Sequence, residues 1–378
     1  MKSRRIIEFL DSVIYGGRTD PPALAVKGGI RAFSALYRAA LRAYLLPFDL
    51  GLRRQQELDR PVISVGNLTV GGTGKTPTVQ YLCRGLTVRD FHPAVLSYGY
   101  GGSLSGRLGV VSDGTQVILN PNEAGDEPVM LASSLPGIPV LVCNHRTASG
   151  RAAIRDFGAD VLILDDGFQV WKLRRDLDIV LLNASRPFDN GRLLPAGRLR
   201  EPPSALKRAD CLILMGRSDE SGEAETLSLI RRFAPDARVF CGKFVSSSLV
   251  SVADGSRVEL QALRDKKVFA LSSIADPCSF EETVAECGAV IVGHGRYPDH
   301  HLYSAGDIAH INREARGAGA ELIVTTEKDA VKLVGRDFSM PVLALRIELE
   351  LDDEAAFWQL VADRIGIPAS DRRGSRVV

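Results

Sequence analysis

The sequence predicts an α/β protein whose core is a doubly wound, mostly parallel sheet, followed by a second, smaller α/β unit. Three observations lead to this fold class. Apolar, β-branched runs alternate with helix-like segments from residue 61 to 233, the pattern of successive βαβ units. One of these runs, at 62–65, leads into a glycine-rich loop and then a helix. Around 235–238 the pattern resets, and a new series of strands and helices begins.

Composition limits the classes to which the chain can belong. Its 378 residues are 45% hydrophobic and 25% charged, an ordinary globular composition with room for about two domains. The net charge of +1 gives no reason to expect a nucleic-acid partner. Six scattered cysteines form no C-x-x-C pair, which indicates a reducing compartment and no structural metal. Residues 1–20 mix charges with short apolar runs, so we expect no signal peptide.

Residues 21–48 lack acidic side chains and predict an amphipathic helix. At about 100° per residue, Lys27, Arg31, Arg38 and Arg42 fall on one narrow arc, and apolar and aromatic side chains fall on the other side. This pattern suits a helix that lies in the interface of an anionic membrane. No apolar run approaches the ~20 residues that span a bilayer. A helix packed on the protein's own core, with a solvated basic edge, is the alternative.

The next element predicts a phosphate-binding loop. A buried strand precedes it, and a helix with Pro77 in its first turn follows it. Glycines allow backbone N–H groups to turn around an anion at the positive end of that helix. Lys75 would reach the outer phosphates and the Thr76 hydroxyl would hold Mg²⁺. Thr69 stands where the strict motif has glycine, so a glycine-rich turn without a ligand is the alternative. The predicted cradle consists of Thr69, Val70, Gly71, Gly72, Thr73, Gly74, Lys75 and Thr76.

Three features lie between this loop and residue 135. A strand at 94–97 runs into a Gly-rich turn at 97–102, and ligands of open α/β sheets bind at such strand ends. The alternation over 109–119, around Asp113-Gly114, predicts a hairpin. Gly125-Asp126-Glu127-Pro128 then opens a helix to about residue 134. Asp126 and Glu127 either cap this helix, or one of them is a base or belongs to a metal shell.

A second acidic site is predicted where the strand at 161–164 ends in Asp165-Asp166. A carboxylate at such a strand end holds Mg²⁺ in nucleotide-binding proteins, and a turn with two capping aspartates is the alternative. A strand at 139–143 and a helix from Arg146 precede it, and strands at 177–182 and 211–215 follow. The loop at 190–203 carries arginines that suit phosphate recognition, or that are merely solvated.

The second unit is predicted to contain strands at 239–245, 268–272, 289–292, 322–326 and 342–347, with helices at 280–286, 304–316 and 354–365. Two of its segments carry possible chemistry. The adjacent His300 and His301 could bind a metal beside Asp299, although neighbours in sequence usually point apart. Residues 325–329 form either a charged, solvated turn or a site.

Taken together, the motifs resemble the tetraacyldisaccharide 4′-kinase family over about residues 10–365. The resemblance is carried by GNLTVGGTGKTP, the GYGG turn, GDEP, DDGFQ, RDLDIVLLNA, LLPAGRLREP, YPDHH and TEKDAVK, in this order. It implies transfer of the γ-phosphate of ATP, with Mg²⁺, to the 4′-hydroxyl of a tetraacylated glucosamine disaccharide 1-phosphate, a late step of lipid A biosynthesis. It also implies a peripheral enzyme on the cytoplasmic face of the bacterial inner membrane, with no obligate protein partner.

The same resemblance implies a domain division and roles for individual residues. We expect a helical, membrane-associating segment at 1–50 as part of the core, a P-loop domain at 51–235, a smaller α/β domain at 236–367 and a flexible tail at 368–378. Lys75 matches the phosphate-loop lysine, and Asp126 matches the general base, paired with a histidine of YPDHH, for which we favour His300. Thr76, Asp165 and Asp166 match the magnesium site. The remaining polar site residues are Glu127, Arg146, Arg200, Glu201 and His301.

Three residues differ from the usual pattern of this family, and one alternative function remains. Tyr98 stands where the family usually has Arg, which affects a cationic contact to substrate or phosphate, while Val170 and His145 replace a usual His and Asp. The rival is a P-loop GTPase-like switch or metallochaperone ATPase that acts through a protein partner. The guanine-reading N-K-x-D motif that would support it is not present in the sequence.

Overall fold

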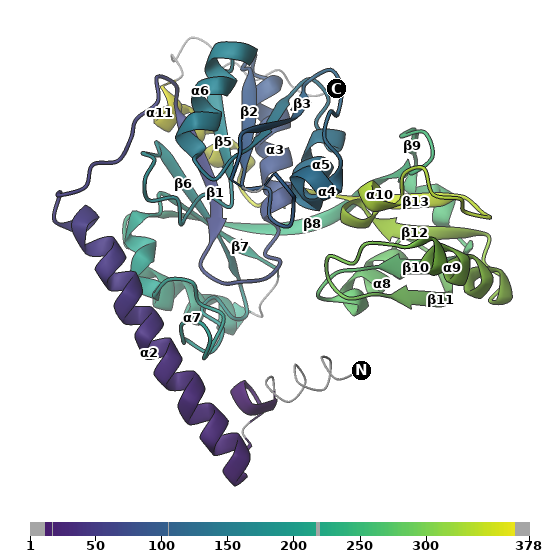
Figure 1. The fold of residues 1–378 in the computed structure, drawn as a ribbon, viewed down its shortest axis with the longest axis horizontal. Coiled ribbons are helices and arrows are strands. Elements are labelled where there is room, and N and C mark those ends of the chain that lie inside the picture. Colours follow the sequence, from purple (N-terminus) through teal and green to yellow (C-terminus); the bar gives the residue numbers. More distant parts are fainter. Residues whose placement is uncertain (1–11, 17, 105, 217–219, 367–378) are drawn as a thin grey trace. The chain divides into compact units, whose positions relative to one another are not determined.

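The structure is a computed structural model that describes residues 12–16, 18–104, 106–216 and 220–366. The predicted tail at 368–378 and the first eleven residues of the N-terminal segment lie outside the described residues. The described chain divides into two compact units. The helices and strands of both are labelled in Figure 1. Unit 1 consists of the residues up to Lys75, Asp166–Gly242 and the chain from Leu351, and unit 2 of Thr76–Asp165 and Lys243–Glu350. The predicted domain limits at residues 50, 235 and 367 stay predictions, since each unit combines segments from both sides of residue 235.

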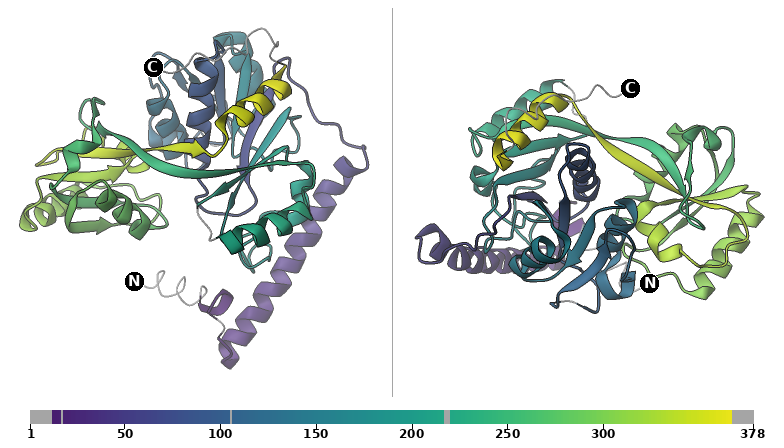
Figure 2. Two further views of the ribbon diagram at one scale, coloured as in Figure 1. Left: turned by 180° about the vertical axis from the view of Figure 1, so that it is seen from behind. Right: turned by 90° about the horizontal axis from the view of Figure 1, so that it is seen from above.

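Unit 1 contains three parallel, buried strands. They are β1 (Val62–Asn67), β6 (Leu177–Asn183) and β7 (Cys211–Met215), in the order β7-β6-β1, and the first residues of β8 (Arg238–Ser251) pair in parallel with β7. The register aligns Val65 with Ile179 and Leu181 with Ile213. Strands covered on both faces have continuous apolar sequences, which is why they were recognisable in the sequence. Helix α11 (Glu354–Ile365), yellow in both views of Figure 2, packs against β6.

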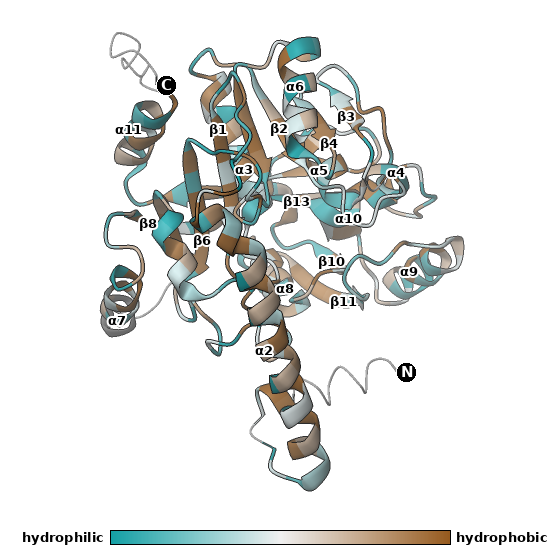
Figure 3. Cartoon of the chain, turned by 60° about the vertical axis from the view of Figure 1, so that its left-hand side comes forward, coloured by the Kyte–Doolittle hydropathy of each residue, from teal (hydrophilic) through white to brown (hydrophobic). Residues whose placement is uncertain are grey.

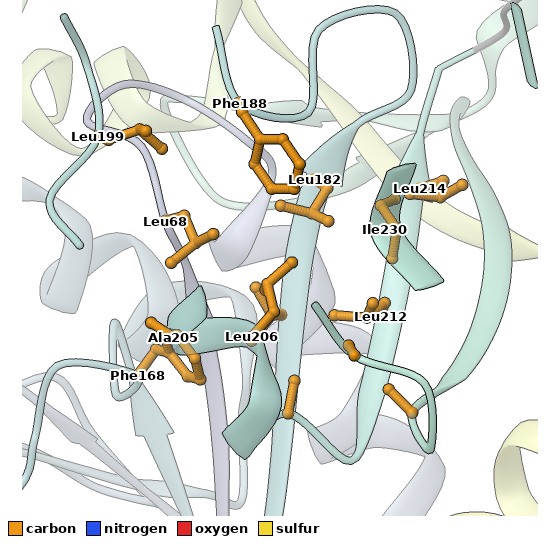
Figure 4. Close-up of a cluster of buried hydrophobic side chains, with 14 of the residues drawn as sticks. Leu68, Phe168, Leu182, Phe188, Leu199, Ala205, Leu206, Leu212, Leu214 and Ile230 are labelled. Carbon is orange, nitrogen blue, oxygen red and sulfur yellow. The ribbon is translucent and has the colours of Figure 1, made fainter. Parts of the chain in front are cut away.

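The core of unit 1 forms around the turns that follow β1 and β6. Figure 4 shows Leu68 and Phe168, both fully buried, among leucines of β6, β7 and the short helix η1 (Pro203–Arg208). Residues from α7 (Glu220–Arg231) complete the cluster. Because Leu68 and Phe168 lie directly beside the phosphate loop and the Asp-Asp turn, the packing of this cluster orders the backbone of both motifs.

Helix α2 (Pro21–Asp49) is the predicted amphipathic helix. It is held to unit 1 by polar contacts: the Ser34 hydroxyl donates to the Leu193 carbonyl at 2.9 Å, and the Tyr37 hydroxyl donates to the Arg200 carbonyl at 2.8 Å. Several of its apolar side chains nevertheless stay exposed, among them Phe33 at 66% and Leu36 at 65%, and Figure 3 shows both brown and teal residues along the helix. In the described part of the chain no helix has the length and apolarity that a bilayer crossing requires.

Unit 2 begins with a second set of strands. The strands β5 (Val161–Asp165), β2 (Pro93–Ser97) and β4 (Pro139–Val142) are parallel, and β3 (Gly109–Asp113) pairs antiparallel with β4. The helices are α3 (Lys75–Thr87), α4 (Pro121–Ala124), α5 (Asp126–Ser134) and α6 (Arg146–Phe157). The hairpin predicted at 109–119 is only partly correct. Beyond the turn, the described chain forms a single bridge, Ser112 to Val117, because β3 takes its ladder partner from β4.

The remainder of unit 2 is a parallel sheet in the order β11-β10-β12-β13. These strands are β10 (Lys267–Ser272), β11 (Val290–Arg296), β12 (Leu322–Thr326) and β13 (Val342–Leu351), with helices α8 (Pro277–Glu286) and α9 (Ala305–Gly317), the short helix η2 (Leu260–Leu263) and a small hairpin of β9 (Arg257–Val258) with β8. The charged turn that was one alternative for 325–329 is wrong. Residues Glu327–Leu333 form helix α10, whose N-cap Thr326 accepts a hydrogen bond from the Asp329 N–H.

Candidate active site

The loop after β1 has the backbone of a phosphate cradle. Gly71 and Gly74 have φ angles of +114° and +85°, which side chains other than glycine rarely adopt. A Cβ at Gly71 or Gly72 would meet no atom within 4 Å, so the backbone there is bare. At the end of β1, the buried Asn67 donates through Nδ2 to the Thr73 hydroxyl at 2.8 Å and thereby braces the loop. The Val70 N–H, in contrast, already donates to the Arg198 carbonyl at 2.8 Å.

At Gly66, the strand that leads into this loop packs closely against the DDGFQ motif. A Cβ at Gly66 would lie 2.5 Å from the Phe168 Cβ and 2.7 Å from the Phe168 nitrogen, distances that real structures do not tolerate. The Gly167 N–H donates to the Val65 carbonyl at 2.9 Å, and Gln169 Nε2 donates to the Asn67 carbonyl at 3.1 Å. The two motifs of unit 1 are therefore packed backbone against backbone, and only glycine at position 66 allows this.

Asp166 lies between two cations of unit 1. Lys75 Nζ is 3.6 Å from Asp166 Oδ1, and Arg200 donates to Asp166 Oδ2 at 2.8 Å. Burial would raise the pKa of the Asp166 carboxyl, but the charges of Lys75 and Arg200 outweigh burial and hold that pKa below its usual value. Asp166 Oδ1 is buried and accepts no hydrogen bond. A carboxylate oxygen of this kind is a ligand that Mg²⁺ prefers, so the residues present fit such an ion.

Two other predicted site residues, Asp165 and Glu201, have polar partners within their own units. In unit 2, Asp165 is buried and accepts a hydrogen bond from the Ser97 hydroxyl at 2.8 Å. In unit 1, Glu201 is only 1% exposed and forms an ion pair with Arg208 at 3.0 Å. The Arg208 guanidinium lies 3.8 Å from the ring centroid of Trp171. The buried Glu201 thus neutralises a partly buried cation of unit 1.

Asp126 and His300 meet in unit 2, although 174 residues separate them in the sequence. His300 Nδ1 lies 2.9 Å from Asp126 Oδ2 and 3.1 Å from Oδ1. Asp126 is 7% exposed and is the first residue of α5, where the helix dipole favours a carboxylate. A Cβ at the preceding Gly125 would lie 2.4 Å from the Tyr100 carbonyl, so the GYGG turn packs tightly against this helix start. His300 itself has a φ of +61°.

Two lysines of α10 lie beside this pair. Lys328 Nζ is 3.2 Å from His300 Nε2 and donates to Asp299 at 2.9 Å, while Lys332 Nζ is 3.9 Å from Asp126 Oδ2. Burial would raise the pKa of Asp126, but the hydrogen bond with His300 and the two ammonium charges keep it below its usual value. The hydrogen bond with Asp126 raises the pKa of His300. At neutral pH, Asp126 is therefore a carboxylate that can accept a proton.

His301 and Arg146 form contacts outside the Asp126–His300 pair. His301 stacks on Tyr297 at 4.7 Å between ring centroids, and its Nε2 lies 3.1 Å from Asp307, which forms the capping box of α9 with Ser304. It is thus His300, and not His301, that contacts Asp126. Within the ranges that the structure describes, no three His, Cys, Asp or Glu side chains form a group that could hold a metal ion. Arg146 is buried, donates to the Cys143 carbonyl, and has its guanidinium 5.6 Å from the ring centroid of Tyr98, one of the family departures.

Sequence reasoning missed Lys328 and Lys332 because residues 325–329 were considered a turn or an undefined site. The signal was present nevertheless. Thr326 followed three residues later by Asp329 is a helix N-terminus signature, and a helix brings residues four apart onto one face. Read as a helix, the TEKDAVK motif presents both lysines together. Glu127, predicted as a polar site residue, is 4.0 Å from Lys328 Nζ and belongs to the same charged group.

Comparisons with known proteins agree on one family. The family model described as LpxK, tetraacyldisaccharide-1-P 4′-kinase, matches residues 28–366. The tetraacyldisaccharide 4′-kinases of Syntrophus aciditrophicus (strain SB) and Pelobacter propionicus are 44% and 40% identical, covering 88% and 90% of this chain and 92% and 93% of the relatives. The crystal structure of "apo" form LpxK from Aquifex aeolicus in complex with ATP is similar with a TM-score of 0.74 and 32% identity, covering 90% of this chain and 99% of that one.

Proposed function

The chain belongs to the tetraacyldisaccharide-1-P 4′-kinase family, and from this premise we propose that it phosphorylates the 4′-hydroxyl of a tetraacylated glucosamine disaccharide 1-phosphate with ATP, in lipid A biosynthesis. The observation that carries the mechanism is the contact of 2.9 Å between His300 Nδ1 and Asp126. A buried carboxylate held by a histidine is the arrangement that a general base for a sugar hydroxyl needs.

In the proposed mechanism Asp126 takes the proton of the 4′-hydroxyl while the hydroxyl oxygen bonds to the γ-phosphorus; the bond from this phosphorus to the bridging oxygen of the β-phosphate breaks, and ADP leaves. The N–H at His300 Nδ1 donates to Asp126, which fixes the orientation of the carboxylate. Lys328 donates to His300 Nε2 when that nitrogen is unprotonated, and this contact favours the tautomer with the proton on Nδ1. Asp126 and His300 thus act as one unit, with the base aligned before the substrate arrives.

The phosphates of ATP are proposed to lie on the backbone of residues 69–76, with Lys75 at the γ-phosphate. The bare glycine backbone of that loop and the bound ATP of the Aquifex aeolicus relative support this part. Thr76, Asp165 and Asp166 would hold Mg²⁺, which neutralises phosphate charge when it is bound. The buried, unbonded Oδ1 of Asp166 supports that assignment. Arg200, which pairs with Asp166, would orient this carboxylate. Roles of Arg146 and Glu201 as polar site residues stay predictions.

Helix α2 is proposed to bind the enzyme to the cytoplasmic face of the inner membrane. Its support is the set of apolar side chains that unit 1 leaves exposed, among them Leu24, Phe33 and Leu36, together with the basic Arg31 and Arg38. Flotation with vesicles that contain an anionic phospholipid tests this. We expect the wild-type chain to float and the double variant Phe33→Glu/Leu36→Glu to stay in the soluble fraction with its fold intact; equal flotation of both would refute the assignment.

Transfer of radiolabelled phosphate tests the activity itself. The purified chain is incubated with γ-labelled ATP, Mg²⁺ and a tetraacyl disaccharide 1-phosphate in mixed micelles, and the lipid is separated by thin-layer chromatography. We expect a labelled bisphosphorylated lipid, and none when the 4′-hydroxyl of the acceptor is blocked. ATP consumption without labelled lipid, stimulated instead by a protein partner, would overturn the proposal in favour of a partner-driven ATPase.

A further inference from the structure

A buried polar cluster lies directly behind the Asp126–His300 pair in unit 2. It consists of Ser273, Asp329 and Lys332, whose side chains are at most 2% exposed. Lys332 Nζ donates to the Ser273 hydroxyl at 2.7 Å and to Asp329 Oδ1 at 2.8 Å. Asp329 also accepts from the Ser273 N–H at 2.8 Å and from the Thr326 hydroxyl at 2.9 Å. Every oxygen of Asp329 is therefore engaged, and its carboxylate fixes the Lys332 ammonium in place.

The cluster connects three elements around the base. Ser273 directly follows β10, Asp329 and Lys332 belong to α10, and α10 packs against α5, which carries Asp126 at its first position. The Lys332 ammonium also lies over the ring of Tyr303, with Nζ 5.6 Å from the ring centroid. From this position the ammonium faces a second carboxylate, Asp126 Oδ2, at 3.9 Å. Lys332 is the buried link between the sheet of β10 and the base.

Stability alone does not account for this arrangement. A buried Lys–Asp pair contributes little more to folding than a well-packed apolar pair of the same volume, because desolvation offsets the attraction. An ammonium between two carboxylates has a second effect, because it also favours the ionised form of the second carboxylate, here Asp126. In a site shielded from water, a positive charge at this distance acts with little screening by salt.

We propose that Lys332 is a positioning residue of the kinase reaction: anchored by Asp329 and Ser273, it keeps Asp126 ionised and turned toward the substrate hydroxyl. This inference rests on the proposed function of Asp126 as the base. It extends that function to a residue that makes no contact with His300 in the described structure.

Other charged groups also lower the pKa of Asp126, and they limit how far that pKa can rise when Lys332 is removed. His300 approaches from the segment after β11, and Lys328 from α10; Lys328 is itself shared with Asp299 and lies 4.0 Å from Glu127. The Lys328 side chain is 17% exposed, against 2% for Lys332. The pKa of Asp126 is depressed by His300, Lys328 and Lys332 against the effect of burial. Without Lys332, two of these three groups remain, so the pKa should rise by a part of the total shift.

The test compares Lys332→Met with the double variant Lys332→Met/Asp329→Asn. The single variant leaves the buried Asp329 without its cation and should lose thermal stability, whereas the double variant removes both charges and should recover most of that loss. In both, the acidic limb of the kcat–pH profile should move to higher pH by about 1 unit, the lower end of what an opposite charge at 4–6 Å produces. Lys332→Arg should restore the wild-type profile.

Lys266→Met is the matched control, since it removes an exposed lysine of the same unit, paired with Glu321 at 2.7 Å, and should leave the profile unchanged. If the double variant regains both stability and the wild-type pH profile, Lys332 is purely structural and the proposal is wrong. Titration of the Asp126 carboxyl by ¹³C NMR, assigned with Asp126→Asn, gives a readout that does not need activity. An unchanged titration in Lys332→Met would overturn the proposal even if lipid phosphorylation itself were not observed.

Discussion

Replacing Asp126 by asparagine removes the proposed base while leaving its surroundings almost intact. Asparagine has the shape of aspartate, and its amide oxygen can still accept the hydrogen bond from His300 Nδ1, now 2.9 Å from the carboxylate. The amide cannot accept a proton from the substrate hydroxyl. The variant therefore separates proton transfer from the packing of α5 against α10.

The expected size of the effect follows from the role. A positioned general base accelerates a reaction by about 10²–10⁴-fold, so kcat should fall by that factor, or about 3–5 kcal/mol at 1.36 kcal/mol per tenfold. The Michaelis constant for ATP should stay within about twofold, since a loss confined to kcat marks an interaction made in the transition state. The phosphate loop at 69–76 does not include Asp126.

The assay is the labelled lipid-transfer reaction, run under saturating ATP across a series of pH values. In the wild-type enzyme kcat should fall at acidic pH as Asp126 becomes protonated, with a midpoint below the usual carboxyl value because its pKa is lowered. In Asp126→Asn the residual rate should lose this acidic limb. A loss of less than about tenfold, or an acidic limb that persists in the variant, would show that another group takes the proton.

Three further predictions concern other parts of the chain. Glu201→Gln should lower the free energy of unfolding by about 1–3 kcal/mol, since it removes the charge that pairs with the partly buried Arg208; urea denaturation measures this, and an unchanged free energy of unfolding would contradict the argument. The His300–Asp126 pair should stabilise the fold most between pH 3.8 and 6.5. The contribution of Asp126 is lost as pH falls through its lowered pKa and that of His300 as pH rises through its raised pKa, so the melting temperatures of wild type and His300→Gln should converge at both extremes. Lys75→Met should reduce kcat by about 10²–10³-fold with an unchanged melting curve; near-normal turnover would exclude Lys75 from phosphate stabilisation.

Most strands and helices could be predicted from the sequence, because they depend on neighbouring residues. The strand of β7 was predicted at its observed limits, and α11 and β12 likewise. Such buried parallel strands have continuous apolar runs, and helices have capping residues and a period of 3.6. The errors arose where a local pattern had two solutions. Residues 109–119 had the alternation of a hairpin, but β3 pairs with β4. Residues 325–329 were predicted as a charged turn or a site, whereas Thr326 is the N-cap of helix α10.

The family, the glycine loop with Lys75 and the motifs that contain Asp126 and the two histidines could be identified from the sequence, since each motif consists of consecutive residues. Tertiary packing sets which histidine contacts Asp126, brings Lys328 and Lys332 beside this pair, and pairs Glu201 with a partly buried arginine. These contacts join side chains far apart in the chain. Their partners depend on how α10 packs on α5 and on how the turns beside β1 close over Phe168, and no local pattern of residues encodes that packing.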